Sequence, residues 1–235
     1  MKQIAIYQVF IALFTFSSFA NAQDPEGGRK SAVVKSHQTK SIDAIYGSFP
    51  LKHAVKHKKI VGQFAYVESN EATGKFLAKF ITKEIVPSID YVSYAGSKKD
   101  AVVLGKRTFS LQNKIDPSSM VVHWVYNQDR KYLCLIGKGQ SASGSGVQVS
   151  YFTLFELEKS GKASSCQEFT SRFGNINSLV SYDKNGNIGY LRIVNGKKMD
   201  QYLLTVNDIK TNKQLDERTL MIKYELNDKF TLLSN

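Results

Sequence analysis

Nine short, strand-like segments in the second half of the chain constrain the fold most strongly. Each is rich in Val, Ile, Leu, Phe or Tyr, and turn-forming clusters separate them. Asn185-Gly186 and Asn195-Gly196 suit tight hairpin turns, because both residues can adopt positive φ. Short strands at this spacing predict an antiparallel meander: a sandwich, a barrel-like sheet or a few propeller blades. The segments are MVVHWVYN, KYLCLIG, VQVSYFTLFELE, SSCQEF, SLVSYD, NIGYLRIVN, MDQYLLTVN, RTLMIKYEL and FTLLS.

A smaller, mixed element is expected before these strands. IVGQFAYVE alternates as a strand does, and IDYVSYAG, DAVVLGK and RTFSLQ read as further short strands. Between the first two, Asn70 can cap a helix that Pro87 ends, which predicts one helix near residues 71–86. The fold class is therefore mainly β with a minor α+β element, in one domain over 61–235 with parts 61–116 and 118–235. The apolar stripe of the expected helix is Ala72, Phe76, Leu77, Phe80, Ile81 and Ile85.

The N-terminus has the three parts of a secretory signal peptide. Lys2 is followed by an apolar stretch, and Ala20-Asn21-Ala22 supplies small residues before a cleavage site. Residues 1–22 are therefore predicted to be removed, which makes the protein periplasmic or secreted. The absence of any Asn-x-Ser/Thr sequon favours a bacterial envelope. No later run is apolar enough to span a bilayer as a helix, so we expect no membrane span after cleavage.

Residues 23–60 are predicted to form a basic, partly flexible leader. From residue 27 to residue 60 there are eight Lys or Arg residues and one acid, Asp43, in a chain whose formal net charge is +12. Such a segment suits an acidic protein surface or an anionic envelope polymer. It carries no motif for nucleic acid, so no nucleic-acid partner is expected. The candidate binding residues here are Lys52, His53, Lys56, His57, Lys58 and Lys59.

The chain has two cysteines, Cys134 and Cys166. An exported chain with an even number of cysteines favours a disulfide, and we predict that these two residues pair. Closing a loop of this length stabilises a fold by roughly 3–4 kcal/mol in the chain-entropy account. Two independent thiols are the alternative.

The run GKGQSASGSG, residues 137–146, is rich in glycine and serine. It lacks the Lys-Ser/Thr ending of a nucleotide-binding loop, and a strand follows it where such a loop needs a helix. Its serines also fall outside a G-x-S-x-G frame. The run is therefore interpreted as a strand connection that can contact a partner. Its candidate binding residues are Lys138, Gln140, Ser141, Ser143 and Ser145.

The sequence holds no catalytic or metal-binding constellation that we can assign. His53 and His57 lie four residues apart, but the lysines around them oppose a divalent cation, so neither a metal nor another cofactor is expected. Glu156 shares a strand face with Glu158. This spacing is more typical of the solvent-facing side of a sheet than of paired acid–base groups. Trp124 and His123 should point to opposite faces of their strand.

These features favour an exported, non-catalytic binding protein of the cell envelope. An inhibitor or immunity-type protein that neutralises a protein partner is the leading hypothesis. Two alternatives stay open: a hydrolase of envelope glycan or lipid that uses Glu156 with His123, and a protein that binds anionic polysaccharide through the basic leader.

Overall fold

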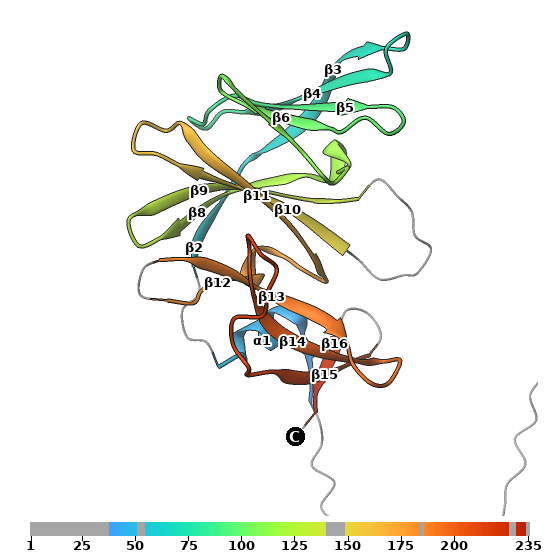
Figure 1. Cartoon of the computed structure of the whole chain (residues 1–235), viewed down its shortest axis with the longest axis vertical. Coiled ribbons are helices and arrows are strands. Elements are labelled where there is room, and N and C mark those ends of the chain that lie inside the picture. Colours follow the sequence, from blue (N-terminus) through green and yellow to red (C-terminus); the bar gives the residue numbers. More distant parts are fainter. Residues whose placement is uncertain (1–37, 51–54, 140–148, 184–185, 226–228, 234–235) are drawn as a thin grey trace, which may run out of the picture. The chain divides into compact units, whose positions relative to one another are not determined.

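A computed structural model describes residues 38–50, 55–139, 149–183, 186–225 and 229–233. The chain divides into the units Met1–Ser36 and His37–Asn235, and every described residue belongs to the second unit. The predicted signal peptide therefore lies outside the described residues. The described part is built from three antiparallel sheets, which are called A, B and C below (Figure 1).

Sheet B contains the central strands, in the order β11-β10-β9-β8-β2. Residues 130–157 form two long neighbours, β9 and β10, that pair from Lys138↔Ser150 to Lys131↔Leu157. This sheet confirms the predicted strands around both cysteines. The bounds are β2 Lys56–Ile60, β8 Val121–Asn127, β9 Arg130–Lys138, β10 Val149–Leu157 and β11 Ala163–Arg172.

Sheet C contains the strands that follow β2 in the sequence, in the order β3-β4-β5-β6-β7. It is a simple meander in which each strand pairs with the next, and β3 and β7 are its two edges. The 3-10 turn η1, Pro117–Ser119, leads from this sheet into β8. The bounds are β3 Gly62–Asn70, β4 Lys75–Thr82, β5 Ile89–Tyr94, β6 Ala101–Leu104 and β7 Arg107–Ser110.

Sheet A combines the C-terminal strands with one strand from the N-terminal side, in the order β1-β16-β15-β14-β13-β12. The helix α1, Ile42–Gly47, directly follows β1, and Ser41 caps it by accepting from Ala44 N. The 3-10 turn η2, Ile176–Ser178, precedes β12. The strand bounds are β1 Thr39–Ser41, β12 Leu179–Ser181, β13 Ile188–Asn195, β14 Gln201–Asp208, β15 Leu220–Tyr224 and β16 Lys229–Leu232.

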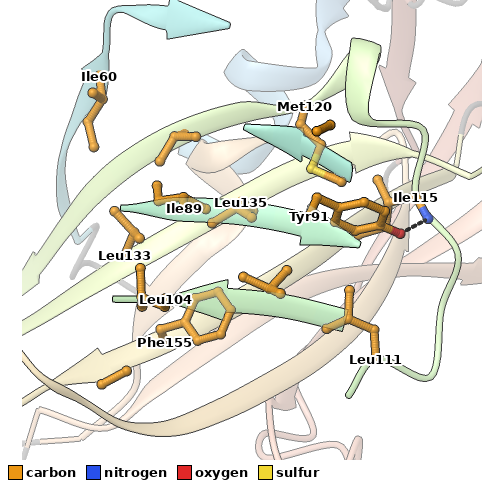
Figure 2. Close-up of a cluster of buried hydrophobic side chains, with 14 of the residues drawn as sticks. Ile60, Ile89, Tyr91, Leu104, Leu111, Ile115, Met120, Leu133, Leu135 and Phe155 are labelled. Carbon is orange, nitrogen blue, oxygen red and sulfur yellow. Dashed lines mark hydrogen bonds between the residues drawn. The ribbon is translucent and has the colours of Figure 1, made fainter. Parts of the chain in front are cut away.

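Apolar side chains bury both faces of sheet B. One core cluster joins sheets C and B through residues such as Tyr91, Leu104, Leu133 and Phe155 (Figure 2). A second joins sheets B and A on the opposite face, and a third packs α1 onto sheet A. Burial on both faces explains why β9 reads as the nearly continuous apolar run YLCLI rather than as an alternating strand.

The predicted class is confirmed: the described part of the chain is mainly β and antiparallel, with three open sheets and a single α-helix. The prediction of a helix near residues 71–86 is wrong, however, because residues 75–82 form β4. Alternation explains the difference: Phe76, Ala78 and Phe80 share the face that packs on sheet B. Long-range pairing with β3 and β5 outweighs the helical spacing of the same apolar residues.

The predicted disulfide is contradicted, because Cys134 and Cys166 are free thiols. Strand β10 lies between them, and Cys134 pairs with Leu154 whereas Cys166 pairs with Phe155. These are consecutive residues of β10, so the two cysteines face opposite sides of sheet B. Two strand spacings separate them by about 10 Å, whereas disulfides need Cα atoms within about 7 Å.

The segment expected to form a basic leader contributes to two sheets. Residues 39–41 pair with β16, α1 packs on sheet A, and residues 56–60 pair with β8. Lys52 and His53 lie outside the described residues. In the parts of the chain that the structure covers, no helix has the length and apolarity needed to cross a membrane.

Candidate functional site

Strand β2 presents four of the predicted binding residues, Lys56, His57, Lys58 and Lys59, and all four are exposed. It forms an edge of sheet B by pairing with β8 from Lys56↔Tyr126 to Ile60↔Val122. One cation is already engaged, because Lys58 Nζ lies 2.9 Å from Glu84 Oε2. The pKa of Glu84 is lowered, first by the hydrogen bond from Val61 N and then by Lys58.

A hollow of about 440 Å³ adjoins this strand, and we call it the His57 hollow. Its floor is apolar, and its polar side chains other than Tyr46 are Asp43, His57 and Asn177. Tyr46 donates its hydroxyl proton to the carbonyl of Phe173 at 3.0 Å. This combination of an apolar wall and a few converging polar groups is typical of binding pockets. The lining residues are Asp43, Tyr46, Gly47, Phe49, Val55, His57, Asn177, Leu179, Val180 and Leu191.

The three polar side chains form a chain of hydrogen bonds. Asn177 Nδ2 donates to Asp43 Oδ1 at 2.8 Å, which leaves Asn177 Oδ1 as the acceptor for His57 Nε2 at 2.9 Å. His57 Nε2 is therefore the donor of this bond. Asn175 Nδ2 also donates to Asp43 Oδ1, at 2.9 Å. These hydrogen bonds connect the His57 side chain on β2 to Asn177 of η2 and, through it, to Asp43 of α1.

His123 lies next to His57 on the same face of sheet B. The ring centroids are 5.9 Å apart and the rings meet edge to face. His123 is 8% exposed, and its Nδ1 is buried and has no hydrogen-bond partner among the described residues. Burial, followed by the charges of His57 and Lys59, lowers the pKa of His123 to about 4. The His123 ring is therefore neutral at pH 7, so it buries no charge beside the core.

The His57 hollow offers one imidazole, one carboxylate, one amide and one phenol, and its lining residues include no serine, cysteine or lysine. Across the described ranges, no group of three or more His, Cys, Asp or Glu residues has an arrangement that could hold a metal ion. The hollow can accept an apolar group and hydrogen-bond a polar group at its rim.

The proposed pairing of Glu156 with His123 in a hydrolase is not assembled. Glu156 Oε1 lies 3.8 Å from Arg130 Nη1, in a separate polar cavity of about 110 Å³ that also includes Tyr182 and Asp208. His123 does not line that cavity; it contacts His57 instead. The two residues thus share a face of sheet B and lie in different surroundings.

The remaining predicted binding residues lie away from the hollow or beyond the described ranges. Lys138 ends β9 and is exposed, and its backbone N donates to Ser119 Oγ at 2.8 Å. It does not line the His57 hollow. The other four residues of the glycine- and serine-rich run lie outside the described residues: Gln140, Ser141, Ser143 and Ser145.

Sequence reasoning missed Asp43 and Asn177 as members of the site. Asp43 and Asn177 are 134 positions apart and meet only because α1 packs beside η2. One signal was present, since Asp43 is the single acid in residues 27–60. An isolated carboxylate in a basic segment indicates a specific contact, but its partner could not be named without the fold.

Comparison of the chain with protein-family models, with curated proteins and with solved structures found no match.

Proposed function

We propose that this protein is an exported, non-catalytic binding protein of the cell envelope, of an inhibitor or immunity type, that engages an acidic protein partner. The contact surface is strand β2 together with the His57 hollow. The observation that carries the proposal is the juxtaposition of an exposed Lys-His-Lys-Lys strand with an apolar hollow of about 440 Å³.

Each half of this surface has a physical role in recognition. Lysines on β2 attract an acidic partner and speed its approach, an effect that added salt weakens. The hollow can bury one apolar side chain of the partner, and burial of such an anchor is worth about 1.5–3 kcal/mol. His57, held by Asn177, can hydrogen-bond a polar group of the partner at the rim. A simple polyanion would use the lysines and leave the hollow empty.

Binding experiments can test the two halves separately. The bait is the tagged protein, and the sample is an envelope extract of the source cells at low ionic strength. We expect one acidic protein to bind in stoichiometric amount. The Lys56→Glu/Lys59→Glu bait should no longer capture this protein. A matched Lys162→Glu/Lys210→Glu bait, changed at exposed residues elsewhere, should still capture it. Retention on the first bait contradicts the role of β2.

Gly47 offers a way to fill the hollow without disturbing the fold. A Cβ added at Gly47 would meet no atom within 4 Å, so Gly47→Trp can place a ring at the hollow. We expect Gly47→Trp to weaken partner binding at least about tenfold, which equals about 1.4 kcal/mol. Gly47→Ala is the matched control and should bind normally. If both variants bind normally, or if only polyanions are captured, the proposal is wrong.

A further inference from the structure

Strand β3 forms one long edge of sheet C. The sheet order places β4 on one side of β3, and among the described residues no strand lies on its other side (Figure 1). From Tyr66 to Asn70 every residue is exposed; Tyr66 is 56% exposed and Val67 is 50% exposed. An edge of this kind offers unpaired backbone donors and acceptors together with apolar side chains.

The other described edges are protected or short. Strand β2 carries three lysines, which oppose pairing with a like strand. Strands β1 and β12 have three residues each, and β7 has four. Strand β11 is longer than β3, but Arg107 Nη1 donates to the carbonyl of Ala163 at 2.6 Å, and Glu168 accepts from Gln112 N at 2.9 Å. Segments of the same chain thus cover β11.

A second hollow, of about 700 Å³, lies along the inner face of β3, and we call it the tyrosine hollow. It can receive side chains from whatever pairs with β3. Its rim is mostly uncharged, with Glu68 as its one ionisable carboxylate. The lining residues are Tyr66, Val67, Glu68, Ser69, Phe76, Ser93, Tyr94 and Ala95.

Charge indicates which partner fits this edge. Residues 62–82, the β3–β4 ribbon, contain two acids and two lysines and are neutral, although the chain as a whole carries a formal charge of +12. An acidic partner is drawn to β2 rather than to a neutral ribbon. Two copies of the chain repel each other least where both are neutral. The ribbon is therefore the surface on which a second copy can dock.

We infer that two copies of this chain associate antiparallel along β3, about a two-fold axis through Val67. Such an interface is isologous, so each residue meets its counterpart in reverse order. An axis through Glu68 would place two carboxylates opposite each other, which is destabilising. With the axis at Val67, valine faces valine and Tyr66 faces Glu68. Val67 is also the residue that β4 leaves unpaired at the bulge between Tyr66 and Glu68.

Sedimentation velocity of the purified protein from about 1 μM to about 1 mM tests the dimer, because mass action makes a weak dimer depend on concentration. We expect a monomer–dimer equilibrium in this range. Val67→Lys places two ammonium groups at the axis and should raise the dissociation constant at least about tenfold. Ile81→Lys is the matched control: it adds the same charge to the ribbon on β4, where Ile81 pairs with Gln63 away from the proposed axis and is 55% exposed.

The outcomes also separate this dimer from the proposed function. Added salt screens repulsion between two basic chains, so it should strengthen the dimer and weaken binding through β2. Lys56→Glu/Lys59→Glu should leave the dimer intact. A monomer at every concentration overturns the inference. An equal effect of Val67→Lys and Ile81→Lys, with both variants folded by circular dichroism, overturns it as well. Neither result bears on partner binding at β2.

Discussion

The hydroxyl of Tyr91 donates a hydrogen bond to Oδ2 of Asp100 across 2.7 Å, inside the core between sheets C and B. The hydroxyl oxygen of Tyr91 also accepts a hydrogen bond from the backbone N of Ile115 at 2.9 Å (Figure 2). Asp100 is 1% exposed, so its carboxylate depends on protein donors. Burial, and then the bond to Asp100, raises the pKa of Tyr91, which keeps the phenol protonated as a donor. One hydroxyl thus ties β5 to the loop before η1.

Replacing Tyr91 by phenylalanine should therefore destabilise the fold. The change removes the donor to a buried carboxylate and the acceptor for Ile115 N, and we expect a loss of about 2–4 kcal/mol in the free energy of unfolding. Urea unfolding followed by circular dichroism measures it. Tyr126→Phe is the control at a site 37% exposed, where a surface change should cost under about 0.5 kcal/mol. Equal losses in the two variants would contradict this role for Tyr91.

The sequence predicts which face of a sheet a side chain occupies where the apolar residues fit only the two-residue repeat of a strand. His123 and Trp124 face opposite sides of β8, as the two-residue repeat requires: Trp124 packs between sheets B and C, and His123 contacts His57. The segment 75–82 was ambiguous, because Phe76 and Phe80 fit both a helical stripe and one face of a strand. Pairing with β3 and β5 decides between helix and strand here, and the sequence of this segment alone does not show that pairing.

The ambiguity at β4 gives a direct test by substitution. Ala78 is 1% exposed and lies across from Tyr91, whereas Ile81 on the opposite face is 55% exposed. Ala78→Asp should destabilise the protein by about 3 kcal/mol or more, since it buries an unpaired charge. Ile81→Ser should cost less than about 1 kcal/mol. In a helix with the predicted stripe the order would be reversed, so thermal unfolding of the two variants discriminates.

The cysteines show a second limit of sequence reasoning. Export and an even count favour pairing, but they carry no information on which strand lies between the two residues. β10 separates Cys134 from Cys166, and its consecutive residues Leu154 and Phe155 set them on opposite faces. Prediction of the candidate site from the sequence meets the same limit, because Asp43, His57 and Asn177 come from three separate elements.

Free thiols should be evident in the mass and reactivity of the purified protein. Burial raises the pKa of Cys134, and burial together with the charge of Glu168 raises the pKa of Cys166 to about 12, so neither forms much thiolate at pH 8. We expect slow alkylation in the native state and two alkyl groups in denaturant without a reductant. A reductant should leave the melting temperature unchanged. Two thiols that alkylate only after reduction would show that the disulfide exists.

His123 makes the stability of the protein depend on pH. Its pKa is lowered to about 4 in the folded state, because burial and the nearby His57 and Lys59 disfavour the charged ring. The unfolded chain titrates near the ordinary value of about 6.5. Between these two values the unfolded state binds more protons, so stability is fully present above pH 6.5 and is lost as the pH falls toward 4.

We therefore expect the free energy of unfolding to fall by up to about 3 kcal/mol between pH 7 and pH 4 through this one group. Urea unfolding at several pH values measures the loss. His123→Leu removes the titrating ring and keeps an apolar side chain against the cluster between sheets B and A, so its stability should change less over this interval. Carboxylates titrate in both proteins below about pH 4.5, which makes the difference between the two curves the informative quantity. Parallel curves from pH 7 to pH 5 would show that His123 is not the group responsible.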